Sequence, residues 1–374
     1  MELSFWEIST WLDKLDFCIV GSGITGLSCA LELRQAHPKA RILVIEKGML
    51  PQGASTKNAG FACFGSLTEI LSDLEHHTEE EVIQLVADRR SGIELLRRRL
   101  GDKTLDYKKW GGYEIFLQHQ SELLENCLDR METINKMLQP VFGEPCFRLA
   151  ENSFGFGKVL PKLILHPFEG QIDTGRMMKA LLEEAQQGPN PVMILNGVCL
   201  RGYEDLGERV LLETNQFGFH ARKVLLATNG FSNSLGQMEV APARAQVLVT
   251  EPIEQLPIRG TFHMDEGYYY FRNVGDRILL GGGRNLNIAG ETTTAFGQTD
   301  QIQQALEALL KEVILPGKTP GIAHRWSGIM GVGPQKRPIL TRLSENVACG
   351  VRLGGMGVAI GSHVGRQLAA LAKD

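Results

Sequence analysis

The stretch from Asp16 to Glu46 decides the fold of this chain. It reads DFCIVGSGITGLSCALEL over residues 16–33 and, after seven further residues, RILVIE over 41–46. This pattern predicts a buried strand, a glycine-rich turn, a helix, and a second buried strand that ends at an acidic residue. A glycine pattern alone also occurs in ordinary strand–helix turns, so the complete unit carries the interpretation.

The three glycines and the acidic residue each meet a separate requirement of a dinucleotide site. Gly21 allows the tight turn, Gly23 lets the backbone approach a pyrophosphate, and Gly26 lets the helix lie close to the strand. The helix N-terminus directs unpaired N–H groups and a positive dipole end at the phosphates. Glu46 lies twenty residues after Gly26, where a carboxylate accepts hydrogen bonds from a ribose diol and disfavours a 2′-phosphate. The binding residues predicted in this unit are Gly21, Ser22, Gly23, Ile24, Thr25, Gly26, Glu46 and Lys47.

The composition is that of an ordinary globular protein and excludes several classes of function. With 374 residues the chain is long enough for two domains or for one large fold in two parts, and 43% of its residues are apolar. The net charge of −4 provides no basic field for nucleic acid. Seven scattered cysteines without a CxxC pair favour a reducing compartment and argue against a disulfide scaffold or a zinc site, so we predict no metal.

The start of the chain and its hydropathy favour a cytoplasmic location. No stretch approaches the ~20 apolar residues of a transmembrane segment. The N-terminus lacks the basic start and apolar centre of a signal peptide. Phe5, Trp6 and Trp11 leave docking on a membrane open, but the segment is not basic, which favours a short helix packed on the body.

Further along the chain, predicted helices alternate with predicted strands. Apolar spacing predicts helices over 74–100, 120–139, 174–187 and 299–314. Other runs predict strands over 111–117, 192–198, 209–214, 219–220 and 223–230, and strands of antiparallel type over 245–250, 267–271 and 277–280. Such alternating βα units, interleaved with a block of strands, predict a nucleotide domain that is discontinuous in sequence and carries a second domain built on its own sheet.

Three further segments carry small residues that let a ligand approach the backbone. Residues 51–65 are small and almost uncharged, which suits contact with a flat ring system, although a glycine-rich surface loop is the alternative. Residues 225–230 end a strand in small polar residues that would face the same ligand. Residues 349–361 predict a strand, a glycine turn and a helix N-terminus that would stabilise negative charge on a ring carbonyl, with a simple glycine turn as the alternative. The predicted contacts are Ser55, Lys57, Asn58, Ala59, Gly60, Phe61, Thr228, Asn229, Gly230, Gly355, Met356, Gly357 and Val358.

Taken together, these segments resemble the FAD-dependent amine and amino-acid oxidoreductases, the superfamily of glycine oxidase, sarcosine oxidase and D-amino-acid oxidase. The resemblance covers nearly the whole chain, and its motifs match in order and approximate spacing. The matching segments are GSGITG over 21–26 with Glu46, GASTKNAG over 53–60, HPFEGQID over 166–173, ATNG over 227–230, WSGIMG over 326–331 with Arg337-Pro338, and GGMG over 354–357.

The resemblance implies an α/β fold, with a discontinuous Rossmann-like FAD-binding domain and a second α+β substrate domain built on an antiparallel sheet. The FAD-binding domain is expected over 1–105, 151–240 and 321–374, and the substrate domain over 106–150 and 241–320.

The resemblance also implies how FAD is held. The pyrophosphate lies at 21–26, the adenosine ribose at Glu46 and the adenine opposite Val198, while 55–61 and 355–358 frame the isoalloxazine. Cys349 lies near the region of the cysteine that tethers flavin in sarcosine oxidase, but core packing is the preferred interpretation, and we expect non-covalent FAD. Cys63 is interpreted as a small filler of the flavin-side loop rather than a redox group.

Candidate substrate residues lie on one predicted strand. Tyr268, Tyr270 and Arg272 alternate along it and share one face, where two aromatic rings and a guanidinium would suit the carboxylate of an amino acid. The alternative is that the tyrosines are packing residues and that Arg272 forms a surface ion pair. Arg352 and His166 are weaker candidates.

One departure from the family pattern bears on the substrate. Glycine oxidase-like members place a carboxylate-binding arginine shortly after Trp326, where this chain has Ser-Gly-Ile-Met. This departure leaves room for an amine, or for carboxylate binding by Arg272 or Arg352.

The resemblance predicts an enzyme that oxidises the CH–N bond of a small amine, amino acid or N-substituted amino acid by hydride transfer to flavin N5. Oxygen or another electron acceptor then reoxidises the flavin. A flavin dehydrogenase of a hydroxy acid or polyol, and a flavin-binding sensor without turnover, are the alternatives. An NAD dehydrogenase is disfavoured because the small-residue loop at 53–60 has no role there.

Overall fold

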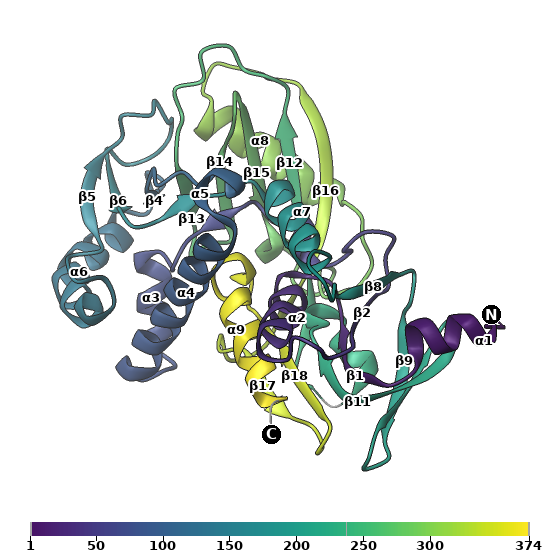
Figure 1. Ribbon diagram of the computed structural model, residues 1–374. Helices are drawn as coiled ribbons and strands as arrows, with labels where there is room; N and C mark the ends of the chain where they lie inside the picture. Colours follow the sequence, from purple (N-terminus) through teal and green to yellow (C-terminus); the bar gives the residue numbers. More distant parts are fainter. Residues whose placement is uncertain (1, 237, 373–374) are drawn as a thin grey trace.

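Over residues 2–236 and 238–372, which the computed structural model describes, two large β-sheets organise the molecule (Figure 1). The first follows the order β17 (Ile339–Arg342), β18 (Val347–Val351), β11 (Gly218–Leu226), β1 (Leu15–Val20), β2 (Ile42–Glu46) and β8 (Met193–Asn196). Neighbouring strands from β18 to β8 are parallel, and β17 is antiparallel to β18. A hairpin joins this sheet along β11 and consists of β9 (Leu200–Asp205) and β10 (Val210–Thr214).

Helices cover one face of the first sheet. Phe17, Ile19, Ile42 and Val44 of β1 and β2 pack on that side into a core shared with these helices. The helices are α2 (Ile24–Ala36), α4 (Glu79–Leu100), α7 (Thr174–Ala185) and α9 (Gly357–Leu371). Alternate strand residues face the other way and pack against the β9–β10 hairpin. The parallel strands therefore lie between two apolar layers, as their continuous hydrophobic sequence predicts.

The second sheet is largely antiparallel and is covered on one face by α8 (Asp300–Leu309) and the following π-helical turn, Leu310–Ile314. Its inner core stacks Phe262 on Phe271, and Ile302 and Leu306 of α8 pack in the same cluster. The strand order is β16 (Ile322–Val332), β12 (Ala241–Thr250), β15 (Arg277–Gly282), β14 (Tyr269–Val274), β13 (Thr261–Met264), β4 (Gly112–Glu114), β6 (Lys162–His166) and β5 (Arg148–Glu151). The predicted α/β class with a second sheet is confirmed. The domain limits stay a prediction, and β6 and β16 lie outside the ranges expected for the substrate domain.

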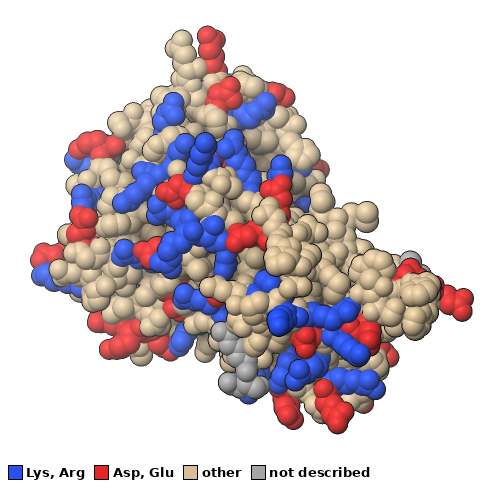
Figure 2. Space-filling model, in the orientation of Figure 1, with Lys and Arg blue, Asp and Glu red and all other residues tan. Residues whose placement is uncertain are grey.

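Shorter elements connect the two sheets. A two-stranded pair of β3 (Phe61–Ala62) and β7 (Gly170–Gln171) lies close to α9. The remaining helices in this part of the molecule are α3 (Leu67–Leu74), α5 (Asp102–Leu105) and α6 (Ser121–Phe142). Among the described residues, no helix combines the length and apolar character needed to cross a membrane. Basic and acidic side chains intermingle on the face shown in Figure 2.

Several predicted element boundaries need correction. The helix expected over 74–100 begins only at Glu79, because α3 ends at Leu74 and Thr78 caps the start of α4 with a capping box to Glu81. The strand expected over 267–271 begins at Tyr269, because Asp265, Glu266 and Gly267 adopt positive φ in a turn. The two strands expected at 219–220 and 223–230 are one strand, β11. It pairs with β10 through its first half and with β1 along much of its length.

The N-terminal helix forms, but its aromatic side chains do not pack on the body. Helix α1 (Phe5–Glu7) has a capping box between Ser4 and Glu7 and continues into a π-helical turn, Ile8–Leu12. Leu12 is buried, whereas Phe5 and Trp6 are 70% and 73% exposed. The expectation of a packed helix is therefore wrong for these two rings, because the short helix turns only one side toward the core.

Candidate functional site

A cavity of about 780 Å³ is lined by residues of both sheets. This volume is in the range of small-molecule and cofactor sites. Most of the residues predicted to contact a dinucleotide line it, namely Gly21, Gly23, Ile24, Thr25, Glu46, Lys47, Ser55, Lys57, Asn58, Ala59, Phe61, Val198, Thr228, Asn229, Gly230, Gly355, Met356, Gly357 and Val358. Ser22, Gly26 and Gly60 lie behind the described lining and support it.

The glycine-rich turn is held by the acid at the end of β2. The buried Glu46 carboxylate accepts hydrogen bonds from the Ser22 backbone N–H at 3.1 Å and from the Ser22 hydroxyl at 2.8 Å. Its second oxygen accepts from the Gly48 N–H at 2.9 Å. Gly21 has a φ of +105°, which favours glycine. The carboxylate therefore shapes the turn as well as lining the cavity, a role that spacing alone did not show.

The small-residue loop after β2 connects the glycine-rich unit to the second sheet. The Ser55 hydroxyl accepts a hydrogen bond from the Ile24 N–H at 3.0 Å, at the start of α2. Trp326 of β16 donates from Nε1 to the Lys57 carbonyl at 2.9 Å. The Asn58 side chain braces the loop internally, because its oxygen accepts from the Gly60 N–H at 2.8 Å and its amide nitrogen donates to the Ser55 carbonyl at 2.8 Å. The loop is thus a built wall of the cavity rather than a free surface loop.

Arg272 is placed away from the cavity, which corrects its prediction as a carboxylate ligand. Its guanidinium donates to the backbone carbonyls of Ala59, Ile172 and Asn273, the last two at 3.0 Å and 3.2 Å. Burial lowers its pKa to about 10. Arg272 shares a strand face with Tyr270, but the loop at 59–60 covers it. Its donors are therefore taken up by the backbone.

Arg352 and His166, the two weaker candidates, are also buried and engaged by the protein itself. Arg352 has a φ of +63°, is buried, and donates to the carbonyls of Arg337 at 3.1 Å and Glu239 at 3.3 Å. The His166 ring packs among Phe64, Phe142 and Phe147, and burial lowers its pKa to about 4. Neither residue is among the described lining of the cavity.

One row of residues crosses the cavity face of the second sheet. Val247, Gly281, Tyr270 and His263 are register partners on β12, β15, β14 and β13. Gly281 leaves space for the Tyr270 ring, since a Cβ there would lie 2.6 Å from that ring. Phe61 contacts the Tyr270 and His263 rings edge-on, at 5.7 Å and 5.3 Å between centroids. Tyr268 and Tyr270, the tyrosines expected to face a substrate, line the cavity, whereas no sequence motif indicated His263.

Charged residues that the sequence did not single out also line the cavity. They are Glu69, Glu266, Arg284 and Lys336. Lys336 forms an ion pair of 2.5 Å with Asp73. Cys63, Glu169 and His263 are of metal-binding types and bring their ligand atoms within 4.8 Å of one another. Both oxygens of Glu169 already engage the Phe64 N–H and the His263 ring, so we interpret this group as a hydrogen-bonded set.

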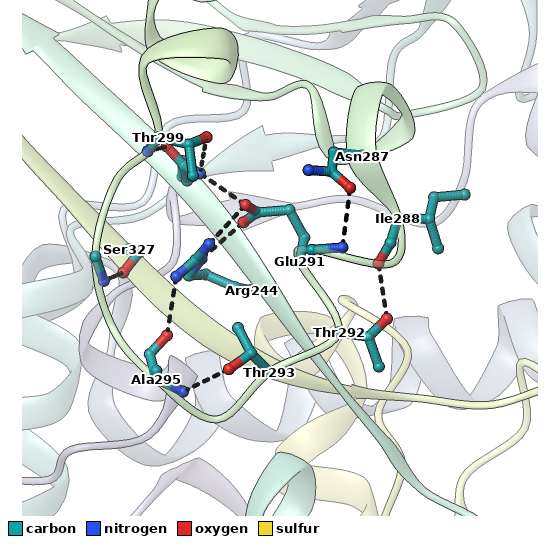
Figure 3. Close-up of polar contacts among 12 residues, drawn as sticks. Arg244, Asn287, Ile288, Glu291, Thr292, Thr293, Ala295, Thr299 and Ser327 are labelled. Carbon is teal, nitrogen blue, oxygen red and sulfur yellow. Dashed lines mark hydrogen bonds and ion pairs between the residues drawn. The ribbon is translucent and has the colours of Figure 1, made fainter.

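The loop from Arg284 to Thr299 contributes Arg284 and Thr294 to the cavity lining and is held by a buried ion pair (Figure 3). Glu291, fully buried, accepts from Arg244 Nε at 2.8 Å and from a terminal nitrogen of Arg244 at 2.7 Å. The Arg244 N–H donates to the Glu291 carbonyl at 2.8 Å. Further along, Thr294 lines the cavity and Phe296 lies 5.5 Å from the Lys57 ammonium.

We expect Glu291→Gln to destabilise the protein by about 3 kcal/mol, since removal of one partner leaves a buried charge unpaired. Thermal unfolding of the FAD-loaded variant is the measurement. Glu307→Gln is the matched control, because Glu307 pairs with Arg325 at 2.7 Å at the surface and should contribute less than about 1 kcal/mol. Equal losses in the two variants would contradict a pinning role for Glu291.

The glycine-rich turn, the acid that supports it and the cavity shared by two sheets define a dinucleotide-dependent enzyme fold. The sequence matches the family model described as "FAD dependent oxidoreductase" over residues 16–371, and the chain belongs to this family. It is 23% identical over 384 residues to gamma-glutamylputrescine oxidoreductase of Escherichia coli strain K12, covering 95% of this chain and 83% of that protein.

Solved structures show the same fold. Glycine oxidase from Geobacillus kaustophilus superposes with a TM-score of 0.75 at 18% identity, covering 96% of this chain and 95% of that one. L-Proline dehydrogenase from P. horikoshii superposes with a TM-score of 0.75 at 17% identity, covering 97% and 94%. The chain is thus an FAD-dependent oxidoreductase in fold and family.

The cavity residues fit FAD. A Cβ on Gly21 would lie 2.8 Å from the Ala227 carbonyl oxygen, so glycine lets this turn pack closely on the end of β11, beside the N-terminus of α2, whose positive dipole end would favour a pyrophosphate. The N-terminus of α9, at Gly357, faces the same cavity and would favour negative charge on the ring system. When bound, FAD supplies a two-electron acceptor for hydride.

Proposed function

We propose that this protein oxidises the CH–N bond of a small amine, amino acid or N-substituted amino acid, with FAD as the hydride acceptor. The observation that carries the proposal is the row of Val247, Tyr270 and His263, which forms an aromatic and largely apolar wall in the cavity where FAD fits. An apolar, desolvated pocket lowers the pKa of an amine and so favours the neutral form that is oxidised. The names of the similar oxidoreductases, which refer to nitrogen compounds, support this choice.

Within this proposal the FAD is non-covalent and the substrate lies against the second sheet. Cys349 lies fully buried within β18 and outside the described lining, which supports the non-covalent assignment. Burial raises the pKa of Tyr270 to about 12, so its phenol stays neutral and presents an uncharged wall. Oxygen or another acceptor would reoxidise the flavin. The scattered, unpaired cysteines support a cytoplasmic location.

The test is anaerobic addition of amines, amino acids, N-methyl amino acids and hydroxy acids to the FAD-loaded protein, followed by its visible spectrum. Bleaching by a nitrogen compound is the expected result. Bleaching by a hydroxy acid alone would replace the proposal with a hydroxy-acid dehydrogenase. Flavin that stays oxidised against every compound would contradict it in favour of a sensor.

Tyr270→Ala should slow flavin reduction by the best nitrogen substrate about 10- to 100-fold, or about 1.4–2.7 kcal/mol, because the cavity wall is lost. FAD content should stay unchanged. Tyr269→Ala is the matched control, since the neighbouring ring points to the opposite face and packs in the core of the second sheet. We expect the control to lower the melting temperature while keeping the reduction rate near that of the wild type. Similar rates in the two variants would remove Tyr270 from the site.

A further inference from the structure

A buried carboxylate–imidazole pair lies at the cavity wall, and neither of its two residues is among the predicted FAD contacts. Glu169 is in the connection between β6 and β7 and is 1% exposed. One of its oxygens accepts a hydrogen bond from the Phe64 N–H at 2.7 Å, and the other lies 3.3 Å from His263 Nε2. Gly112 leaves the space for this carboxylate, since a Cβ there would lie 1.8 Å from it. The fold thus builds a place for Glu169 directly behind His263.

His263 is the member of the pair that reaches the cavity. Its side chain is 8% exposed and lines the cavity next to its register partner, Tyr270. The Phe61 ring packs edge-on against the His263 imidazole. Among the described residues, the hydrogen-bond partner found for the His263 ring is Glu169, which contacts its Nε2 atom. Within the described part of the chain, Glu169 therefore holds Nε2, and no hydrogen bond is found at Nδ1.

The charges around Glu169 and His263 affect which of the two groups carries a proton. Burial opposes ionisation of Glu169, but the hydrogen bond and charge of His263 hold the pKa of this carboxyl below its usual value. Burial likewise opposes protonation of His263, but Glu169, and more weakly Glu69 and Glu114, raise its pKa above the usual value. His166 on β6 and Cys63 on the loop after β3 face the pair from the other packed elements. An ionised Glu169 holds a proton at Nε2, so the neutral ring presents a lone pair at Nδ1.

We propose that His263 Nδ1 accepts a proton from the substrate ammonium, and that Glu169 is the positioning residue that holds the ring for this step. The inference rests on the proposed function, because an amine enters mostly as an ammonium ion and is oxidised as the neutral amine. In the step one N–H bond of the ammonium breaks, its electron pair stays on the substrate nitrogen, and an Nδ1–H bond forms. Neither group changes oxidation state, and the proton later leaves to solvent.

The first test is the pH dependence of anaerobic flavin reduction in His263→Gln, with the amine that reduces the wild type fastest as the probe. Glutamine keeps a donor near the position of Nε2 and removes the base. At pH 7 we expect a reduction rate about 10²- to 10⁴-fold below that of the wild type. The deficit should shrink below about 10-fold as pH approaches the pKa of the amine, because neutral substrate is then supplied by solution. His37→Gln, a half-buried imidazole that contacts Phe17 outside the described lining of the cavity, is the control and should show no such pH-dependent deficit.

The second test separates this inference from the proposed function. The ring pKa of His263, followed by NMR of isotope-labelled histidine in FAD-loaded protein, should fall in Glu169→Gln. An unchanged pKa would overturn the positioning role of Glu169. A deficit in His263→Gln that is equal at every pH, or one confined to KM, would overturn the proton-transfer role and indicate a structural or anion-binding one. Failure of the wild type to be reduced by any amine would instead contradict the proposed function itself, and this proton transfer with it.

Discussion

Gly26→Ala is expected to lower the affinity for FAD by at least 100-fold, which corresponds to about 2.7 kcal/mol. Gly26 is buried in the first turn of α2, and a Cβ there would lie 1.9 Å from the Gly21 carbonyl oxygen and 3.3 Å from Ile19 Cγ2. Neither neighbour is the flexible end of a long side chain, so the helix or the turn has to move. Both belong to the turn and helix N-terminus that we expect to hold the pyrophosphate, and this arrangement is lost when either moves.

The measurement is the FAD content of the purified variant, followed by titration of FAD into the protein freed of cofactor. Gly202→Ala is the matched control, because Gly202 lies on β9 at negative φ and an added Cβ finds its nearest neighbour at 3.8 Å. The control should bind FAD as the wild type does. Full FAD content in Gly26→Ala would show that the glycine-rich turn is not the pyrophosphate site.

Arg272→Met should destabilise the protein by about 3 kcal/mol or more, although Arg272 lies outside the described lining of the cavity. Its guanidinium satisfies three backbone carbonyls, those of Ala59, Ile172 and Asn273. The Asn273 carbonyl keeps a donor in the Gln171 amide at 3.3 Å, but the other two carbonyls lose the Arg272 donor, and a buried acceptor left without a donor costs about 1–3 kcal/mol. Because Ala59 belongs to the small-residue loop that lines the cavity, FAD affinity should fall together with stability.

Urea unfolding of the FAD-loaded variant and FAD titration are the measurements for this prediction. Arg201→Met is the control, since Arg201 is exposed on β9 and its replacement should change stability by less than about 0.5 kcal/mol. The earlier expectation of a carboxylate ligand makes the opposite prediction. A stable Arg272→Met that binds FAD normally but loses affinity for an amino acid would restore that role.

The sequence predicted those segments whose structure depends on neighbouring residues in the chain, such as glycine turns, apolar strands and helix caps. The unit from β1 to Glu46 has a glycine pattern and two apolar runs, and its requirements are met within one stretch of chain. Aspartate is among the residue types that favour helix N-caps, and the Asp173 side chain accepts a hydrogen bond from the Arg176 N–H at the start of α7. The cavity lining near 55–61 and 355–358 was predicted through the resemblance to a family of FAD-dependent enzymes, and the structure brings those segments together.

The surroundings of the charged residues were decided by tertiary structure. Alternation correctly put Tyr270 and Arg272 on one face of a strand, but the loop that covers Arg272 comes from more than 200 residues earlier in the chain. His263 and Glu169 come from β13 and the β6–β7 connection, and neither segment carries a motif that pairs them. A strand's own sequence gives its alternation but not its neighbours. The sequence alone therefore determined the class of cofactor, whereas long-range strand register and loop packing decided which polar side chains reach the cavity.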